Sequence, residues 1–291
     1  MSLNQYFKPF LLFFLISGLF GKILIPESND EYPEFLNKND KSREYYEITN
    51  KGLEYIVKGP AEIKIFAKAA FPKRTINEAK AFSYNILIND LLTVSENSKN
   101  IDRNISSLSH PMHVYTYSAK DVLVVPSGDY VIKINKNSFF GNPPILVRLS
   151  RSGRKSKNNI KEEFEFPSPS SVYKLKTIKS DFQPSYRSLK VNQPLFLNDI
   201  DGLLEFNLRG LHENISSAPE IVKATLLKNG KENTKYHIWS SPHPSTTIVG
   251  DDRIPGKLNK IYIQLNQNNY LFNLQGDNSK ELFIKLNRFV K

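Results

Sequence analysis

Two stretches of alternating apolar and polar residues, 140 positions apart (261 − 121), constrain the fold of this chain more than any other feature. The first is Asp121 to Ile134, DVLVVPSGDYVIKI, and the second is Ile261 to Leu274, IYIQLNQNNYLFNL. In each, the second half alternates with a period of two, which predicts a strand with one buried and one exposed face. The residues in the middle, 126–129 and 266–269, suit a tight reversal. We therefore expect one β-hairpin that occurs twice.

A second pair of hairpins is predicted at the same offset. The alternating run Phe82 to Ile88 leads into Asn89-Asp90, and the run Val222 to Leu226 leads into Asn229-Gly230. Both dipeptides favour two-residue hairpin turns. Because 229 − 89 and 270 − 130 are both 140, we expect a duplicated domain in which Asn89 superposes on Asn229 and Tyr130 on Tyr270.

Length and composition fit two β-domains. The chain has 291 residues, 40% of them hydrophobic and 24% charged, which is a globular balance. Its 19 Phe and 14 Tyr favour strands. The prediction is an all-β chain of two tandem antiparallel β-sandwich (immunoglobulin-like) domains after a signal peptide. The expected segments are a signal peptide at 1–21, an extended lead-in at 22–43, the first sandwich at 44–150, a basic linker containing Pro and Ser at 151–179, and the second sandwich at 180–291. At Gly59-Pro60, two strands or one bent strand would fit.

The N-terminus has the pattern of a secretory signal. Its apolar core, Pro9 to Phe20, is about 12 residues long, and a membrane-spanning helix needs about 20. We expect cleavage near Gly21 and a secreted, periplasmic or cell-surface protein with no transmembrane span after cleavage; a retained anchor is the alternative. The chain has no Cys, which excludes a lipid-modified N-terminal cysteine and disulfides.

Positive charge is concentrated between the two halves. The formal net charge is +11, of which residues 151–179 carry 8 − 3 = +5. The charged side chains that could contact an anionic partner are Arg151, Arg154, Lys155 and Lys157. An anionic cell-surface polymer or glycan, or lipid headgroups, would be the partner, and nucleic acid is not expected for a secreted protein. The alternative is a solvated linker, and no other protein partner can be named.

The single Trp raises a carbohydrate-binding alternative. Trp239 lies near Tyr236 and His243, and an exposed aromatic ring on a sandwich can stack on a sugar. The competing interpretation is that Trp239 continues a strand into the core.

No set of catalytic residues can be assembled from the sequence. His110 and His113 lack a third ligand, and His237 and His243 have no carboxylate near them in the sequence. Asp251-Asp252 is interpreted as a turn. We expect no catalytic residues, no metal and no cofactor, and hence no enzyme; a secreted hydrolase with an unrecognised site is the second alternative.

The segment KGLEYIVKGPAEIKI, Lys51 to Ile65, with the later Pro126-x-Gly128-x-Tyr130, resembles uncharacterised secreted bacterial proteins that carry a duplicated β-sandwich. The second part also resembles immunoglobulin-like and carboxypeptidase-regulatory-like modules. The resemblance implies the fold and export, and no activity. The leading functional hypothesis is a non-catalytic secreted or cell-surface binding or structural module.

Overall fold

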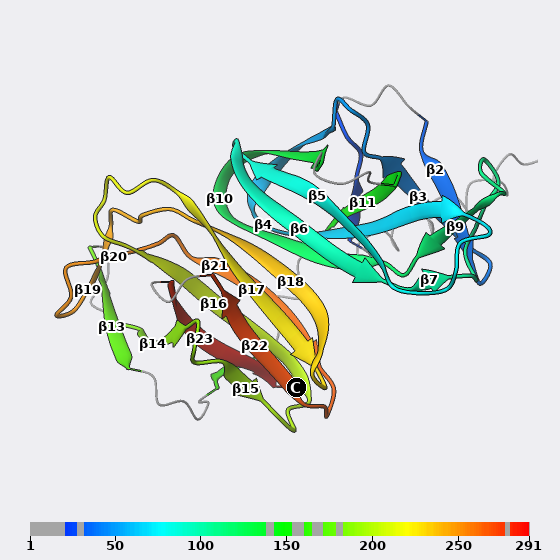
Figure 1. Ribbon diagram of the computed structural model, residues 1–291. Helices are drawn as coiled ribbons and strands as arrows, with labels where there is room; N and C mark the ends of the chain where they lie inside the picture. Colours follow the sequence, from blue (N-terminus) through cyan, green and yellow to red (C-terminus); the bar gives the residue numbers. More distant parts are fainter. Residues whose placement is uncertain are drawn as a thin grey trace, which may run out of the picture.

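The structure is a computed structural model that describes residues 21–27, 32–137, 143–152, 160–164, 171–178, 183–276 and 280–290. These residues form strands and loops arranged as two β-sandwiches (Figure 1). None of them forms a helix that could cross a membrane. The predicted signal peptide lies outside the described residues except for Gly21. The predicted all-β class with two sandwiches is confirmed.

The strands of the first sandwich are β1 (Lys22–Leu24), β2 (Glu34–Lys38), β3 (Lys41–Glu47), β4 (Leu53–Pro72), β5 (Lys80–Ile88), β6 (Leu91–Lys99), β7 (Ile101–Asp102), β8 (Ser106–Ser107), β9 (His113–Thr116), β10 (Ala119–Lys136) and β11 (Ile145–Arg151). Those of the second are β12 (Ile160–Glu163), β13 (Val172–Thr177), β14 (Ser185–Lys190), β15 (Leu195–Leu197), β16 (Gly202–His212), β17 (Glu220–Lys228), β18 (Lys231–Ser240), β19 (Thr246–Ile248), β20 (Ile254–Pro255), β21 (Asn259–Leu265), β22 (Tyr270–Gln275) and β23 (Glu281–Val290).

Two long strands, β4 and β10, pair along most of their length and change register together between Val125 and Gly128. The partner of Gly128 is Gly59, where a Cβ atom would lie 1.8 Å from the Pro126 carbonyl oxygen, so only glycine allows this approach. The segment 121–134 is therefore one strand with a bulge, and the hairpin predicted there is wrong. Of the two alternatives at Gly59-Pro60, a single strand through this site is confirmed.

The second predicted copy is also not a hairpin. Strand β21 pairs with β16, whereas β22 pairs with β15 and β17, and these partners belong to different sheets. Residues 266–269 therefore connect one sheet to the other. A period of two identifies a strand but carries no information on its neighbour, which is why the sequence misassigned both pairings.

The turns at Asn89-Asp90 and Asn229-Gly230 are confirmed. All four residues have positive φ, between 45° and 75°, and strands β5 and β6, like β17 and β18, pair directly across them. Ile88 pairs with Ile132 and Lys228 with Tyr270, so Tyr270 corresponds to Ile132 and the offset there is 138. The predicted equivalence of Tyr130 and Tyr270 is thus displaced by two residues. Because side chains alternate with a period of two, a shift of two residues leaves Tyr270 on the predicted face of its strand.

Both predicted non-core segments contain strands. In the expected lead-in, β2 and β3 form a hairpin, and Leu36 and Tyr45 are buried against Tyr115 and Leu146. In the expected linker, β12 pairs with β23, and β13 pairs with β14 and β19. These short strands were missed because their apolar residues are few and their partners are distant in sequence.

The two sandwiches share a sheet. Residues 121–124 of β10 pair in parallel with residues 235–238 of β18, a parallel exception to the predicted antiparallel pairing. Strand β18 presents Tyr236 and Ile238 to the core of the second sandwich and Trp239 to the core of the first. Each core therefore contains part of this junction.

Candidate functional site

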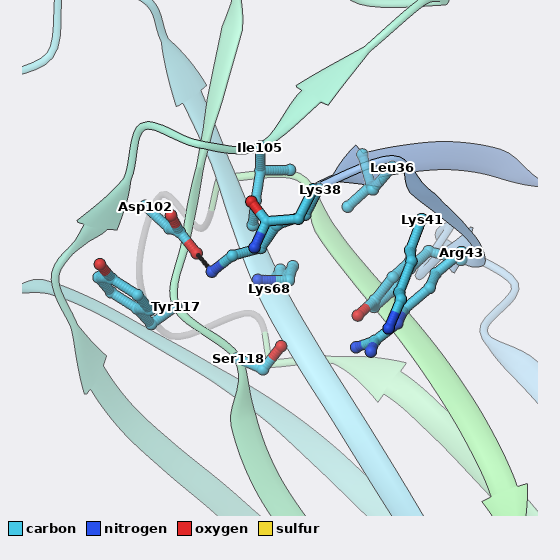
Figure 2. A pocket seen from close by; sticks show the side chains of 11 residues that line it. Leu36, Lys38, Lys41, Arg43, Lys68, Asp102, Ile105, Tyr117 and Ser118 are labelled. Atoms are coloured by element: carbon cyan, nitrogen blue, oxygen red, sulfur yellow. Dashed lines mark hydrogen bonds and ion pairs between the residues drawn. The ribbon is translucent and has the colours of Figure 1, made fainter.

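A pocket of about 520 Å³ lies in the first sandwich. We call it the cationic pocket; it is lined by Leu36, Lys38, Asn39, Lys41, Arg43, Tyr45, Lys68, Asp102, Ile105, Tyr117 and Ser118. Its walls come from the β2–β3 hairpin and from residues at and after β7 and β9 (Figure 2). Four cations and one carboxylate give the lining a formal charge of 4 − 1 = +3.

The β2–β3 hairpin brings three of these cations together. Asn39 and Asp40 both have positive φ (47° and 57°), so the turn takes two residues and Lys38 pairs with Lys41. Arg43 is two residues beyond Lys41 and so lies on the same face of β3. Figure 2 shows the side chains of Lys41 and Arg43 extending together from this wall.

Lys68 is the most buried cation of the pocket. In β4, Ala67 and Ala69 face the main core, so Lys68 points to the opposite face. Its side chain is 6% exposed, and its Nζ donates a hydrogen bond of 2.9 Å to the Thr116 carbonyl oxygen. Burial lowers the pKa of Lys68 to about 8; Asp102 opposes this shift, and Lys38 adds to it by repulsion.

Asp102 and Tyr117 organise the rim. Asp102 is buried and forms a 2.5 Å ion pair with the Lys38 Nζ. The same amine lies 5.3 Å from the centre of the Tyr117 ring, which is 48% exposed. Lys38 is therefore held by two neighbours. No metal cluster of three or more His, Cys, Asp or Glu side chains occurs among the described residues. The chemistry that the pocket offers is the binding of an anion by ammonium and guanidinium groups.

The residues predicted to bind a ligand are not brought together. Trp239 is 6% exposed and packs edge-on against Tyr130, with ring centroids 5.7 Å apart. Tyr236 is buried in the other core, and His243 contacts the Thr246 hydroxyl at 2.8 Å. Trp239 is therefore a junction residue, and its burial favours the core interpretation over sugar stacking.

Of the four basic side chains predicted to contact an anionic partner, the structure describes Arg151. Arg151 donates a hydrogen bond to the Pro60 carbonyl oxygen at 3.1 Å, which occupies part of its guanidinium group. Arg154, Lys155 and Lys157 lie outside the described residues. Contact of these four side chains with an anionic partner stays a prediction.

A buried polar network crosses the junction. His237 Nε2 lies 2.9 Å from Asp121 Oδ1, and His237 Nδ1 lies 3.2 Å from the Thr93 hydroxyl. Ser95 and Tyr84 donate hydrogen bonds to Asp121 Oδ2. Although burial raises the pKa of Asp121, these hydrogen bonds and His237 lower it overall. His237 has no carboxylate near it in the sequence, and the fold supplies one, Asp121, from 116 residues earlier in the chain.

Other predicted sites have structural roles. Asp251 accepts hydrogen bonds from the backbone and the guanidinium group of Arg253, as expected for a turn. His110 and His113 stack with ring centroids 5.1 Å apart, and His110 Nδ1 lies 3.2 Å from a Glu34 carboxylate oxygen.

Sequence reasoning missed the cationic pocket. Three of its cations lie in the segment interpreted as a lead-in, 22–43, where the Lys-Asn-Asp-Lys turn was not recognised. Lys68 carried a weak signal, since it shares a strand face with Phe66 and Ala70 within an apolar run.

No protein-family model matches the chain, and no curated protein is significantly similar to it. Among solved structures, it is similar to a tandem CBM22 domain of Paenibacillus barcinonensis Xyn10C (7% identity, 92% of this chain and 97% of that chain, TM-score 0.23). It is also similar to tandem CBM51 modules of Sp3GH98 from Streptococcus pneumoniae SP3-BS71 (10% identity, 94% and 93%, TM-score 0.21). A third similar structure is the ANX2 ectodomain of Arabidopsis thaliana (9% identity, 91% and 90%, TM-score 0.24). TM-scores of this size carry no argument about the ligand, so the functional argument rests on the pocket itself.

Proposed function

We propose that this protein is a non-catalytic, exported binding module whose cationic pocket holds the anionic group of an acidic polysaccharide. The observation that supports this function is Lys68, a nearly fully buried ammonium group placed among Lys38, Lys41 and Arg43. A buried cation is costly, and a nearby cation increases that cost. A carboxylate or sulfate in the pocket would offset both.

The shape of the pocket supports a sugar ring as the carrier of the charge. Tyr117 leaves about half of its surface exposed beside the cations. A ring of this kind can stack on the apolar face of a sugar while the ammonium groups bind its acidic substituent. The carbohydrate-binding alternative is thus retained, with Tyr117 in place of Trp239 as the aromatic ring that stacks on the sugar.

The proposal is tested by titrating the full chain with polygalacturonate and with heparin. The variant Lys41→Gln/Arg43→Gln removes two exposed cations from the lining and leaves the core intact. The matched control, Lys190→Gln/Lys231→Gln, removes two exposed lysines from the second sandwich. We expect roughly thirtyfold weaker binding for the first variant and wild-type binding for the control, because the two lost charge contacts contribute on the order of 1 kcal/mol each.

Tyr117→Ala separates a sugar from a free anion. It should weaken polygalacturonate binding and leave the binding of inorganic sulfate unchanged. Equal losses in the pocket variant and its control would show that only the net charge matters, and the proposed site would be wrong.

A further inference from the structure

Three of the most exposed apolar side chains of the first sandwich lie in two loops that are hydrogen-bonded to each other, residues 73–79 and 103–112. Ile76 is 73% exposed, Leu108 is 86% exposed and Met112 is 66% exposed. We call these three residues the apolar tip. Large side chains exposed to this extent on neighbouring loops mark an interaction surface, because isolated ones are ordinary and clustered ones are not.

One backbone hydrogen bond and one side-chain hydrogen bond connect the loops of the apolar tip. The Lys73 amide donates to the Met112 carbonyl oxygen at 2.8 Å, and the Arg103 guanidinium donates to the Thr75 carbonyl oxygen at 3.0 Å. The loop after β4 is therefore joined to the segments on both sides of Leu108. The three apolar side chains therefore belong to loops that are bonded to one another.

The charge around the apolar tip is positive. Lys73, Arg74 and Arg103 are exposed in the same loops. The acidic residue of the 73–79 loop, Glu78, is paired with Lys80 at 2.5 Å. Cations that surround exposed apolar side chains complement a surface with anionic groups above an apolar layer.

The position of the apolar tip leaves it accessible to an extended surface. Figure 1 shows β2, β7 and β9 at the end of the first sandwich that points away from the second sandwich. The second sandwich therefore does not stand between the apolar tip and a flat partner.

We propose that the apolar tip docks on the surface of an anionic phospholipid bilayer. Ile76, Leu108 and Met112 enter the boundary between headgroups and acyl chains, and Lys73, Arg74 and Arg103 contact lipid phosphates. This inference is separate from the proposed function, because it uses none of the residues that line the cationic pocket.

The test is sedimentation of the full chain with vesicles of phosphatidylcholine, with and without phosphatidylglycerol. We expect binding that needs phosphatidylglycerol and that falls about tenfold or more in Ile76→Ser/Leu108→Ser/Met112→Ser, since apolar burial supplies much of the affinity of interfacial proteins. Ile215→Ser/Val249→Ser removes two exposed apolar side chains from the second sandwich and should bind as the wild type does.

Insertion is tested by fluorescence. Trp239 is buried, so the wild type should show little quenching by bromine-labelled lipids. Leu108→Trp should be quenched strongly when vesicles are added. Vesicle binding without quenching would leave surface charge as the cause and overturn insertion of the apolar tip.

Two further outcomes would overturn the proposal. The first is wild-type vesicle binding by the triple serine variant. The second is a wild type that does not bind vesicles but dimerises as its concentration rises, with dimerisation lost in the triple serine variant. That result would assign the surface to a second copy of the chain. Polygalacturonate binding should be unchanged in the triple serine variant, so the failure of either proposal can be told from the failure of the other.

Discussion

Replacing Lys68 by methionine should stabilise the protein and weaken anion binding. Methionine keeps most of the aliphatic length of lysine and removes the buried ammonium group. The pKa of Lys68 falls from 10.5 to about 8 in the folded protein, and one pKa unit corresponds to about 1.4 kcal/mol. Burying the charge therefore costs about 3 to 4 kcal/mol. Loss of the hydrogen bond to the Thr116 carbonyl oxygen offsets about 1 kcal/mol, which leaves a gain of about 2 to 3 kcal/mol at neutral pH.

The gain should depend on pH in a defined direction. Below about pH 8, Lys68 is charged in both the folded and the unfolded protein, and the wild type carries the full cost. Between about 8 and 10.5, the folded state releases its proton and the unfolded state does not, so the stability of the wild type rises with pH relative to the variant. Above 10.5 the cost disappears and only the lost hydrogen bond separates the two proteins.

Urea unfolding of the wild type and of Lys68→Met at several pH values measures this difference. The control is Lys64→Met, a half-exposed lysine of the same strand, which should change the free energy of unfolding by less than about 0.5 kcal/mol. A destabilised Lys68→Met at neutral pH would refute the reasoning. A stability difference that stays constant between pH 7 and 10.5 would do so as well.

Two more predictions concern buried carboxylates. Asp121→Asn should lower the free energy of unfolding by about 3 to 5 kcal/mol, because it breaks a buried pair with His237; a loss below 1 kcal/mol in urea unfolding would contradict this. Although burial raises the pKa of Glu205, hydrogen bonds from Lys161 at 2.6 Å, from Tyr262 and from Asn287 lower it to about 2. The contribution of Glu205 to the free energy of unfolding, about 2 to 3 kcal/mol, should be present above pH 4.5 and lost as pH falls toward 2. In Glu205→Gln, the free energy of unfolding should therefore fall less steeply with decreasing pH than in the wild type. An unchanged dependence on pH would count against this role.

The sequence predicted the local features of the fold well. Period-two runs identified strands because the pleat fixes which side chains are buried, and the Asn-Asp and Asn-Gly turns were correct because few residues tolerate two successive positive φ angles. Strand partners could not be predicted in the same way. The pairings of β4 with β10 and of β10 with β18 join residues far apart in the chain, and alternation is the same whichever strand lies alongside.

The candidate site was hidden for a similar reason. Lys68 looks ordinary in the sequence, and only the packing of the β2–β3 hairpin over β4 makes it a buried cation. Trp239 was predicted to bind a ligand because it is the only Trp in the chain. The rarity of a residue type does not predict whether its side chain is exposed. Contacts that create a site between distant segments leave little trace in single-residue composition.

The junction determines how the cationic pocket can operate. Strand β18 places side chains in both cores, with Tyr236 on one side and Trp239 on the other, and Asp121 bonds His237 between them. A hinge motion at this point would have to expose the buried Asp121 carboxylate and break the hydrogen bonds between β10 and β18, which costs several kcal/mol. The two sandwiches should therefore not close around a ligand. The cationic pocket lies within the first sandwich and is bounded by a short hairpin with a tight turn. Its cations are held close together before the ligand arrives, so the repulsion among them is already present in the free protein and is relieved when an anion binds.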